Sequence, residues 1–309
     1  MLPEKGTLPF SAKPRVRLID FLPMRDIQTI AVIGAGTMGR GIAQIAATAG
    51  YRVVLVDADA AALDRGLSSI RDGMDKLVEK KKLEASQRDE ALARVTTVGT
   101  LAMGVKHADC VIEAVPELLE LKVRIFRDLD RNAPSHAILA TNTSSLPVRT
   151  LAAATKRPEL VVGMHFFNPV PVMPLLELVR AEKTSDETIA AAVAIAGRMG
   201  KDSIVVRDTP GFATSRLGVL LGLEAIRMLE AGVASAEDLD KAMTLGYRHP
   251  MGPLKLTDLV GLDVRLAIAE HLHRELQSEA FRPPELMRRM VAEGKLGKKS
   301  GQGFYRWDV

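Results

Sequence analysis

The chain has 309 residues, of which 47% are hydrophobic and 26% are charged, and its formal net charge at pH 7 is +4. This length and composition are typical of a soluble globular protein with room for two domains. The mild positive charge suits a small anionic ligand but gives no support for a nucleic-acid partner, and no apolar run approaches the ~20 residues of a membrane span.

The single cysteine, Cys110, excludes an intramolecular disulfide and suits a reducing compartment, for which we expect the cytoplasm. It lies in a run that reads as a buried strand, so we interpret it as a small apolar filler rather than a nucleophile. No metal site is expected.

Residues 1–28 differ from the rest of the chain and are interpreted as an N-terminal extension. Four prolines and scattered basic residues precede the first regular pattern, and there is no compact apolar core of a secretory signal. The acidic residues Glu4, Asp20 and Asp26 weaken the alternative of an organelle transit segment, and Met24 is an alternative start.

A glycine-rich loop follows the first predicted strand. Residues 30–33 are apolar and predict a buried strand, and the loop Gly34-Ala35-Gly36-Thr37-Met38-Gly39 comes directly after it. A helical run at 41–49 and a second strand at 52–56 follow, and that strand ends in Asp57. The pattern G-x-G-x-x-G is specific for a dinucleotide when a strand precedes it, a helix follows it and an acidic residue lies ~20 positions on.

Each part of this pattern has a physical role. Gly34 permits the tight turn, Gly36 lets the backbone approach a pyrophosphate, and Gly39 lets the helix pack close to the strand. The helix N-terminus offers free N–H groups to the phosphates. Asp57 would accept hydrogen bonds from the adenosine ribose and repel a 2′-phosphate, which favours NAD over NADP. The cofactor-binding residues predicted in the loop are Gly34, Gly36, Thr37, Met38 and Gly39.

The alternation of strands and helices continues after Asp57. Further strands are predicted at 94–98, 110–115, 138–141 and 204–206, with helices at 118–132 and 186–199. This order predicts an α/β fold with a Rossmann-type, doubly wound and mostly parallel sheet. Ligands of such sheets bind at the carboxyl ends of the strands. Glu117, Asn142 and Ser144 each follow a predicted strand on that edge.

A helical hairpin is expected between the second and third strands, because helical periodicity runs over 60–83. It carries a lysine run that includes Lys76, Lys80 and Lys81. Such a run is most often a solvated face, but a phosphate-rich substrate would give it a role through point-charge contacts.

Two apolar segments at 160–165 and 175–179 flank a proline-rich stretch, which predicts a strand, a tight turn and a returning strand. This return would bring His165 close to Glu177. The carboxylate would fix the tautomer of the imidazole and stabilise its protonated form, as the orienting group of a general base does. The alternative is a buried polar pair that only satisfies itself.

The strand signals stop after Asp208, and the remainder is predicted to be helical. Helices are expected at 212–230, at 254–270 with an interruption at Gly261, and at 284–293, and Ser235 begins a capping box. The predicted domains are therefore a dinucleotide-binding domain at 29–208 and a smaller all-α C-terminal domain at 209–309. Helices this apolar usually pack against a second copy, so we expect a homodimer.

Several motifs together resemble the L-3-hydroxyacyl-CoA dehydrogenase family. They are the glycine loop, Asn142-Thr143-Ser144-Ser145-Leu146, His165-Phe166-Phe167-Asn168-Pro169, Asp208-Thr209-Pro210-Gly211-Phe212, Pro250-Met251-Gly252-Pro253 and Lys299-Ser300-Gly301-Gln302-Gly303-Phe304-Tyr305. The resemblance covers roughly residues 28–307. It implies NAD-dependent oxidation of a 3-hydroxyacyl-CoA, such as 3-hydroxybutyryl-CoA, to the 3-oxoacyl-CoA, and the reverse reaction.

The resemblance also implies roles for individual residues. His165 would be the base that takes the hydroxyl proton, and Glu177 would orient it. Ser144 would hydrogen-bond the reacting oxygen or the thioester region, and Asn168 would line the same pocket. Contacts near the nicotinamide side of the cofactor are implied for Glu117, Lys122 and Asn142. Contacts with coenzyme A are implied for Lys76, Lys80 and Lys81.

One position departs from the family pattern. Better-known members have asparagine where this chain has Ser215, which is shorter and would need a shifted substrate or a water to keep a substrate contact. Two alternatives remain at this point: a dehydrogenase of a small free 3-hydroxy acid of the carnitine or gulonate type, and a non-catalytic dinucleotide-binding protein. The presence of His165, Glu177 and Ser144 argues against the second.

Overall fold

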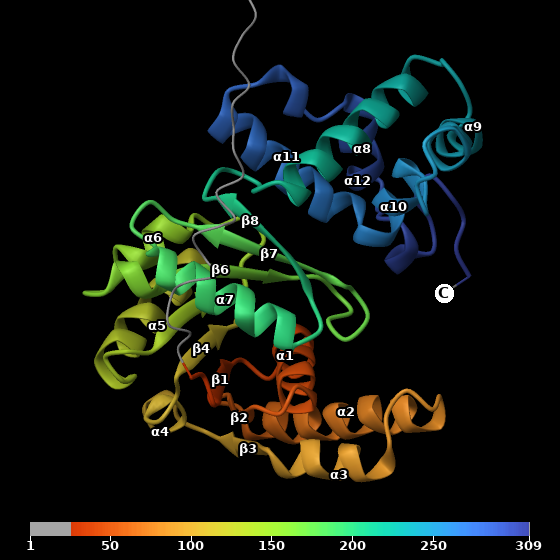
Figure 1. The fold of residues 1–309 in the computed structure, drawn as a ribbon. Helices are drawn as coiled ribbons and strands as arrows, with labels where there is room; N and C mark the ends of the chain where they lie inside the picture. Colours follow the sequence, from red (N-terminus) through yellow and green to blue (C-terminus); the bar gives the residue numbers. More distant parts are fainter. Residues whose placement is uncertain (1–25, 309) are drawn as a thin grey trace, which may run out of the picture.

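The computed structural model describes residues 26–308 (Figure 1). Most of the expected N-terminal extension, residues 1–25, lies outside the described residues, as does Val309. Eight strands form one sheet in the order β3-β2-β1-β4-β5-β6-β7-β8. They are β1 (Thr29–Ile33), β2 (Arg52–Val56), β3 (Val95–Val98), β4 (Cys110–Glu113), β5 (Ile138–Thr141), β6 (Val161–Phe166), β7 (Leu175–Arg180) and β8 (Asp202–Arg207).

The sheet is mostly parallel, as the sequence predicts. The pair of β6 and β7 is antiparallel, whereas β7 and β8 are parallel to each other, as are the neighbouring strands from β3 to β6. The central strands β1, β4 and β5 are buried throughout. Strands that are covered on both faces need continuous apolar runs rather than alternation, which is why these segments are so rich in valine and isoleucine.

Helices cover both faces of the sheet and create two cores. The helices of this half are α1 (Thr37–Thr48), α2 (Ala60–Glu79), α3 (Ala85–Ala93), α4 (Leu101–Val105), α5 (Leu119–Asn132), α6 (Val148–Ala152) and α7 (Asp186–Arg198), with a 3₁₀ turn at Pro158–Leu160. One core packs α1, α2, α3 and α7 against the sheet. The other packs α4, α5 and α6 against the opposite face. The sequence reading did not predict α4 and α6, which have five residues each.

The predicted helical hairpin is formed by α2 and α3. Its first helix ends at Glu79, and residues 80–84 make the turn, so the helix is shorter than the periodicity over 60–83 suggests. The carboxylate of Asp59 caps α2 by accepting from the N–H of Ala61 at 2.9 Å. Figure 1 shows the two helices side by side, with the tip extending beyond the sheet.

The helical half has its own core. It contains α8 (Thr214–Glu230), α9 (Ala236–Lys241), α10 (Pro253–Val260), α11 (Leu262–Leu276) and α12 (Glu285–Ala292), a π-helical turn at Ala242–Gly246 and 3₁₀ turns at Glu279–Phe281 and Lys298–Ser300. Gly261, with φ +102°, separates α10 from α11 where an interruption is expected. Phe212 has φ +48°, which no helix adopts, so α8 begins later than predicted.

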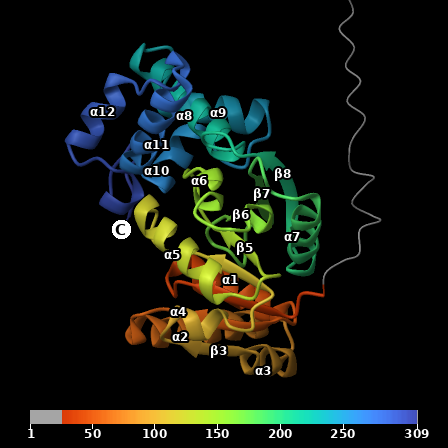
Figure 2. The ribbon, with the colours of Figure 1, turned by 90° about the vertical axis from the view of Figure 1, so that its left-hand side faces the viewer.

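Figures 1 and 2 show the helical half lying above the part of the sheet that holds β7 and β8. The first turn of α8 thereby reaches the edge of the sheet where the candidate site residues gather. Among the described helices, none combines the length and the apolarity that a bilayer crossing needs. Residues 26–308 contain no cluster of three or more potential metal-ligating acidic, histidine or cysteine side chains.

Candidate active site

The glycine loop leaves no room for side chains at two of its three glycines. A Cβ at Gly39 would lie 1.8 Å from the carbonyl oxygen of Gly34, because β1 and α1 pack closely there. Gly34 has φ +103°, and a Cβ on it would lie 2.8 Å from the carbonyl oxygen of Ala114. A Cβ at Gly36 would meet nothing within 4 Å. The loop is therefore tight where it supports the fold and open where a pyrophosphate would approach.

The N-terminus of α1 is available to an anion. Gly36 is its N-cap and has no side chain to satisfy the first N–H groups, and Thr37 and Met38 make up the start of the first turn. Asp57, at the end of β2, accepts from the N–H of Ala35 at 2.8 Å. The predicted ribose-binding residue thus also holds the glycine loop. These donors and this carboxylate fit the phosphates and ribose of a dinucleotide.

His165 and Glu177 lie opposite each other in the antiparallel register of β6 and β7. Nδ1 of His165 is 3.0 Å from Oε2 of Glu177, and the two side chains are 7% and 0% exposed. The ring also packs against Phe167 and Phe212, at centroid distances of 4.5 and 6.0 Å. With Nδ1 directed at the carboxylate, Nε2 is the nitrogen left to exchange a proton with a ligand.

Glu177 accepts further hydrogen bonds from the start of the helical half. The N–H groups of Ala213 and Thr214 donate to Oε1 at 2.9 and 3.2 Å, and the hydroxyl of Thr214 donates to Oε2 at 2.7 Å. Burial acts to raise the pKa of Glu177, but the hydrogen bonds from His165, Thr214 and the backbone outweigh it and hold that pKa below its ordinary value. Glu177 is therefore ionised near neutral pH, and its negative charge can stabilise positive charge that develops on the imidazole of His165.

The proline-rich turn between β6 and β7 carries Asn168, which is exposed and precedes a cis peptide bond to Pro169. A buried lysine from outside the turn supports it. The ammonium of Lys201 donates to the carbonyl oxygens of Val170 and Met173 at 2.5 and 2.7 Å. Burial lowers the pKa of Lys201. This anchor was missed by the sequence analysis, because a lone lysine before a strand has no local signal of burial.

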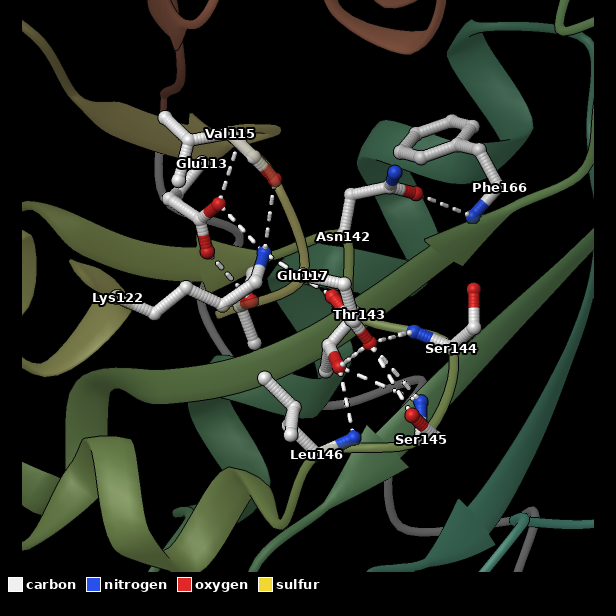
Figure 3. A network of polar contacts seen from close by, with 11 residues as sticks. Glu113, Val115, Glu117, Lys122, Asn142, Thr143, Ser144, Ser145, Leu146 and Phe166 are labelled. Carbon is white, nitrogen blue, oxygen red and sulfur yellow. Dashed lines mark hydrogen bonds and ion pairs between the residues drawn. The ribbon is translucent and has the colours of Figure 1, made fainter. Parts of the chain in front are cut away.

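Glu117 organises the loop after β5, as Figure 3 shows. Its Oε1 accepts from the N–H of Ser144 at 2.9 Å, the N–H of Ser145 at 3.2 Å and the hydroxyl of Thr143 at 2.5 Å. The strand-end residues Glu117 and Ser144 are therefore brought together, as expected from the carboxyl edge of a parallel sheet. The hydroxyl of Ser144 is left for a ligand, because the main chain supplies the contact to Glu117.

Lys122 lies in the interior beneath this loop. Its Nζ is 2.6 Å from Oε1 of Glu113 and 3.4 Å from Oε2 of Glu117, and its side chain is 0% exposed (Figure 3). Thr141 donates to the other oxygen of Glu113 at 2.7 Å, which completes a buried network. Although a contact with the cofactor was expected, the ammonium is enclosed by protein in this structure. Its contacts make it a support for Glu117.

Asn142 and Ser215 connect the strand ends to their neighbours. Oδ1 of Asn142 accepts from the N–H of Phe166 at 2.9 Å and thereby ties the end of β5 to the residue after His165 (Figure 3). The hydroxyl of Ser215, in the first turn of α8, lies 3.5 Å from the carbonyl oxygen of Ser144. Residues from both halves of the chain thus meet beside the histidine.

The lysines of the hairpin lie apart from this cluster. Lys76 is in the last turn of α2, and Lys80 and Lys81 follow in the turn toward α3. All three are exposed. Their side chains are therefore open to solvent and to an anionic ligand at the hairpin.

Hydride transfer to a dinucleotide requires a binding loop for the dinucleotide and a proton acceptor near the reacting carbon, and the glycine loop and His165 lie at the same edge of this sheet. The fold and the site therefore define the class of NAD-binding oxidoreductases. The family model of the 3-hydroxyacyl-CoA dehydrogenase NAD-binding domain matches residues 29–209, and that of the C-terminal domain of the same enzymes matches 211–307. The chain belongs to the 3-hydroxyacyl-CoA dehydrogenase family.

Curated relatives and solved structures agree with this assignment. A probable 3-hydroxybutyryl-CoA dehydrogenase of Bacillus subtilis is 45% identical over 283 residues, which cover 92% of this chain and 98% of the relative. The mitochondrial hydroxyacyl-coenzyme A dehydrogenase of Sus scrofa is 42% identical, covering 91% of each chain. The crystal structure of (S)-3-hydroxybutyryl-CoA dehydrogenase from Ralstonia eutropha is 44% identical, with a TM-score of 0.89 and coverage of 92% and 100%.

Proposed function

We propose that this protein catalyses the NAD-dependent oxidation of an (S)-3-hydroxyacyl-CoA, such as 3-hydroxybutyryl-CoA, to the 3-oxoacyl-CoA, and the reverse reaction. The observation that carries the proposal is the His165–Glu177 pair, buried and hydrogen-bonded at 3.0 Å on the sheet edge that also holds the glycine loop. The relatives named 3-hydroxybutyryl-CoA dehydrogenase support the choice of a short acyl chain.

In the oxidation, Nε2 of His165 takes the proton of the C3 hydroxyl, and the imidazolium that forms is stabilised by Glu177. A nicotinamide held beside the glycine loop would supply the hydride acceptor for C3 in this direction, and its reduced form would supply the hydride in the reverse reaction. In the reverse direction the imidazolium returns its proton to the carbonyl oxygen. The apolar rings of Phe167 and Phe212 limit the access of water to the proton.

For the cofactor, we propose that Gly34, Gly36, Thr37, Met38 and Gly39 hold the pyrophosphate at the start of α1 and that Asp57 binds the adenosine ribose. Glu117 and Asn142, at the ends of β4 and β5, face the nicotinamide side. Lys122 acts on that side through Glu117, whose carboxylate it approaches at 3.4 Å.

For the substrate, we propose contacts from Ser144 and Asn168 to the reacting oxygen or thioester region, and from Ser215 across the same pocket. The exposed lysines Lys76, Lys80 and Lys81 would meet the phosphates of coenzyme A as point charges. A free 3-hydroxy acid has no phosphates for these lysines to bind. A coenzyme A thioester therefore gives the three lysines a role that the free acid does not.

The organisation of the chain is part of the proposal. We assign residues 29–208 to the NAD-binding domain and 209–309 to the C-terminal domain. Exposed apolar side chains of the helical half support a homodimer through that half; they include Leu217, Leu245, Tyr247, Leu256 and Val264. Cys110 is a buried free thiol, and burial raises its pKa to about 12. We propose a cytoplasmic location, because a chain with one cysteine and no intramolecular disulfide suits a reducing compartment.

The function is tested by the oxidation of NADH in the presence of acetoacetyl-CoA, compared with free acetoacetate and with NADPH. We expect rapid turnover for the thioester with NADH alone. His165→Gln should lose most of the rate and still bind NADH, which separates loss of the base from loss of the fold. If the thioester is inert while a free hydroxy acid such as carnitine is oxidised with NAD, the small-acid function replaces this one.

A further inference from the structure

The carboxylate of Glu177 is shared between the two halves of the chain. Its Oε2 accepts two hydrogen bonds, from Nδ1 of His165 at 3.0 Å and from the hydroxyl of Thr214 at 2.7 Å. Its Oε1 accepts from the N–H groups of Ala213 and Thr214. Since Thr214 is the first residue of α8, the positive end of that helix also faces the carboxylate.

Building on the function proposed above, we propose that Thr214 is a positioning residue of the catalytic base: its hydroxyl shares Oε2 of Glu177 with His165 and thereby limits the proton affinity of the imidazole. A carboxylate oxygen that accepts a second strong hydrogen bond offers less negative charge to the first donor. Glu177 therefore stabilises the imidazolium less than it would if Oε2 accepted a hydrogen bond from His165 alone. A less stabilised imidazolium gives up its proton more readily, which favours the reverse reaction.

The surroundings of His165 leave Glu177 as the ionisable group through which this effect acts. The rings of Phe167 and Phe212 pack on the imidazole and do not titrate. From β8, Ile204 is the register partner of Glu177 and is apolar. On the first turn of α8, Arg216 is exposed, so solvent and salt screen its charge.

The hydroxyl of Thr214 can be removed while Glu177 keeps its other hydrogen bonds, because Oε1 of Glu177 has donors of its own. These donors are backbone N–H groups, which Thr214→Val keeps. Valine shares the β-branched shape of threonine, so the change removes one hydroxyl and little else. Thr214→Ser keeps the hydroxyl and removes one methyl group, which makes it the matched control.

The test is a titration of the imidazole of His165 by NMR in protein labelled with ¹³C-histidine. The chain has six histidines, and His165→Gln identifies the signal of interest. We expect Thr214→Val to raise the titration midpoint by about half a pH unit, the order expected from losing one competing hydrogen bond. Thr214→Ser should titrate as the wild type does. The acidic limb of the kcat/KM profile for oxidation should shift upward by the same amount in Thr214→Val.

An unchanged or lowered midpoint in Thr214→Val overturns the proposal, and so does an equal shift in Thr214→Ser. A shift in Thr214→Val that serine rescues supports it. The titration needs no substrate. A wild-type protein that fails to reduce acetoacetyl-CoA would therefore refute the proposed function and leave the result on Thr214 standing.

Discussion

His165 and Glu177 are register partners across β6 and β7, and the separation of Nδ1 from Oε2 is 3.0 Å. The pairing follows from the antiparallel return of the chain, which places the two side chains opposite each other on the same face of the sheet. Both are almost fully buried. A base and its orienting carboxylate are thus built into the sheet itself rather than into a mobile loop.

Replacing Glu177 by glutamine should slow the reaction by ~100-fold or more, within the range expected for general acid–base catalysis. The amide has nearly the shape of the carboxylate but no charge to stabilise the imidazolium. The rate of acetoacetyl-CoA reduction and the dissociation constant of NADH should be measured together. NADH binding should be unchanged, and a rate equal to that of the wild type would refute the role of Glu177.

Stability at acidic pH should depend on the same carboxylate. The folded-state pKa of Glu177 lies below its ordinary value of 4.5. Its ionisation therefore adds stability above the unfolded pKa, and this contribution is lost as the pH falls through the folded pKa. Urea unfolding from pH 6 to pH 3 should show wild type losing stability faster than Glu177→Gln. Parallel pH dependences would contradict the lowered pKa.

Lys122→Met should destabilise the protein by ~3–5 kcal/mol, because it leaves the buried charge of Glu113 without its partner. Both side chains are 0% exposed. The double variant Glu113→Gln/Lys122→Met removes both charges and should recover part of the loss. Chemical denaturation of the wild type, Lys122→Met, Glu113→Gln and the double variant measures this coupling, and a double variant whose loss equals the sum of the two single losses would show that the two residues do not act as a pair.

Asp57→Asn should weaken the preference for NADH over NADPH. The change removes the negative charge that would repel a 2′-phosphate but keeps an oxygen that can accept from the N–H of Ala35. The ratio of kcat/KM for the two cofactors should fall, with the melting temperature close to that of the wild type. An unchanged ratio would mean that Asp57 serves only to hold the glycine loop.

Lys201→Met should loosen the turn that carries Asn168, because the carbonyl oxygens of Val170 and Met173 lose their donor. The expected loss of stability is ~1–3 kcal/mol. The KM for acetoacetyl-CoA should rise more than kcat falls, since the base pair in the strands is untouched. Lys183→Met, an exposed lysine after β7, is the control and should change neither quantity. A fall in kcat with an unchanged KM would contradict the prediction that Lys201 acts by holding the turn that carries Asn168.

The sequence predicts the parts of this site that local patterns encode. The glycine loop is readable because strand, turn and helix follow one another between residues 29 and 48. His165 and Glu177 are readable because a proline-rich turn between apolar runs predicts a hairpin-like return. Family resemblance adds roles for Ser144 and Asn168 that no spacing could supply.

Other features depend on contacts between distant segments and have no local signal. Thr214 donates to a carboxylate 37 positions earlier in the chain, and Lys201 supports a carbonyl 31 positions earlier. The burial of Lys122 is not predicted either, because a lysine in an amphipathic helix is normally assigned to the solvent face. Its ionic partner, Glu113, lies inside a strand.

The contacts of Ala213 and Thr214 with Glu177 also constrain how such enzymes can be recombined. A chimera that joined this sheet to the helical half of a relative would place the relative's residue at position 214, and a residue without a hydroxyl there would remove a hydrogen-bond donor from Oε2 of Glu177. The exchange of a module chosen for its acyl preference would then alter the acid–base chemistry of the recipient. The helical half therefore influences both the choice of substrate and the transfer of the proton.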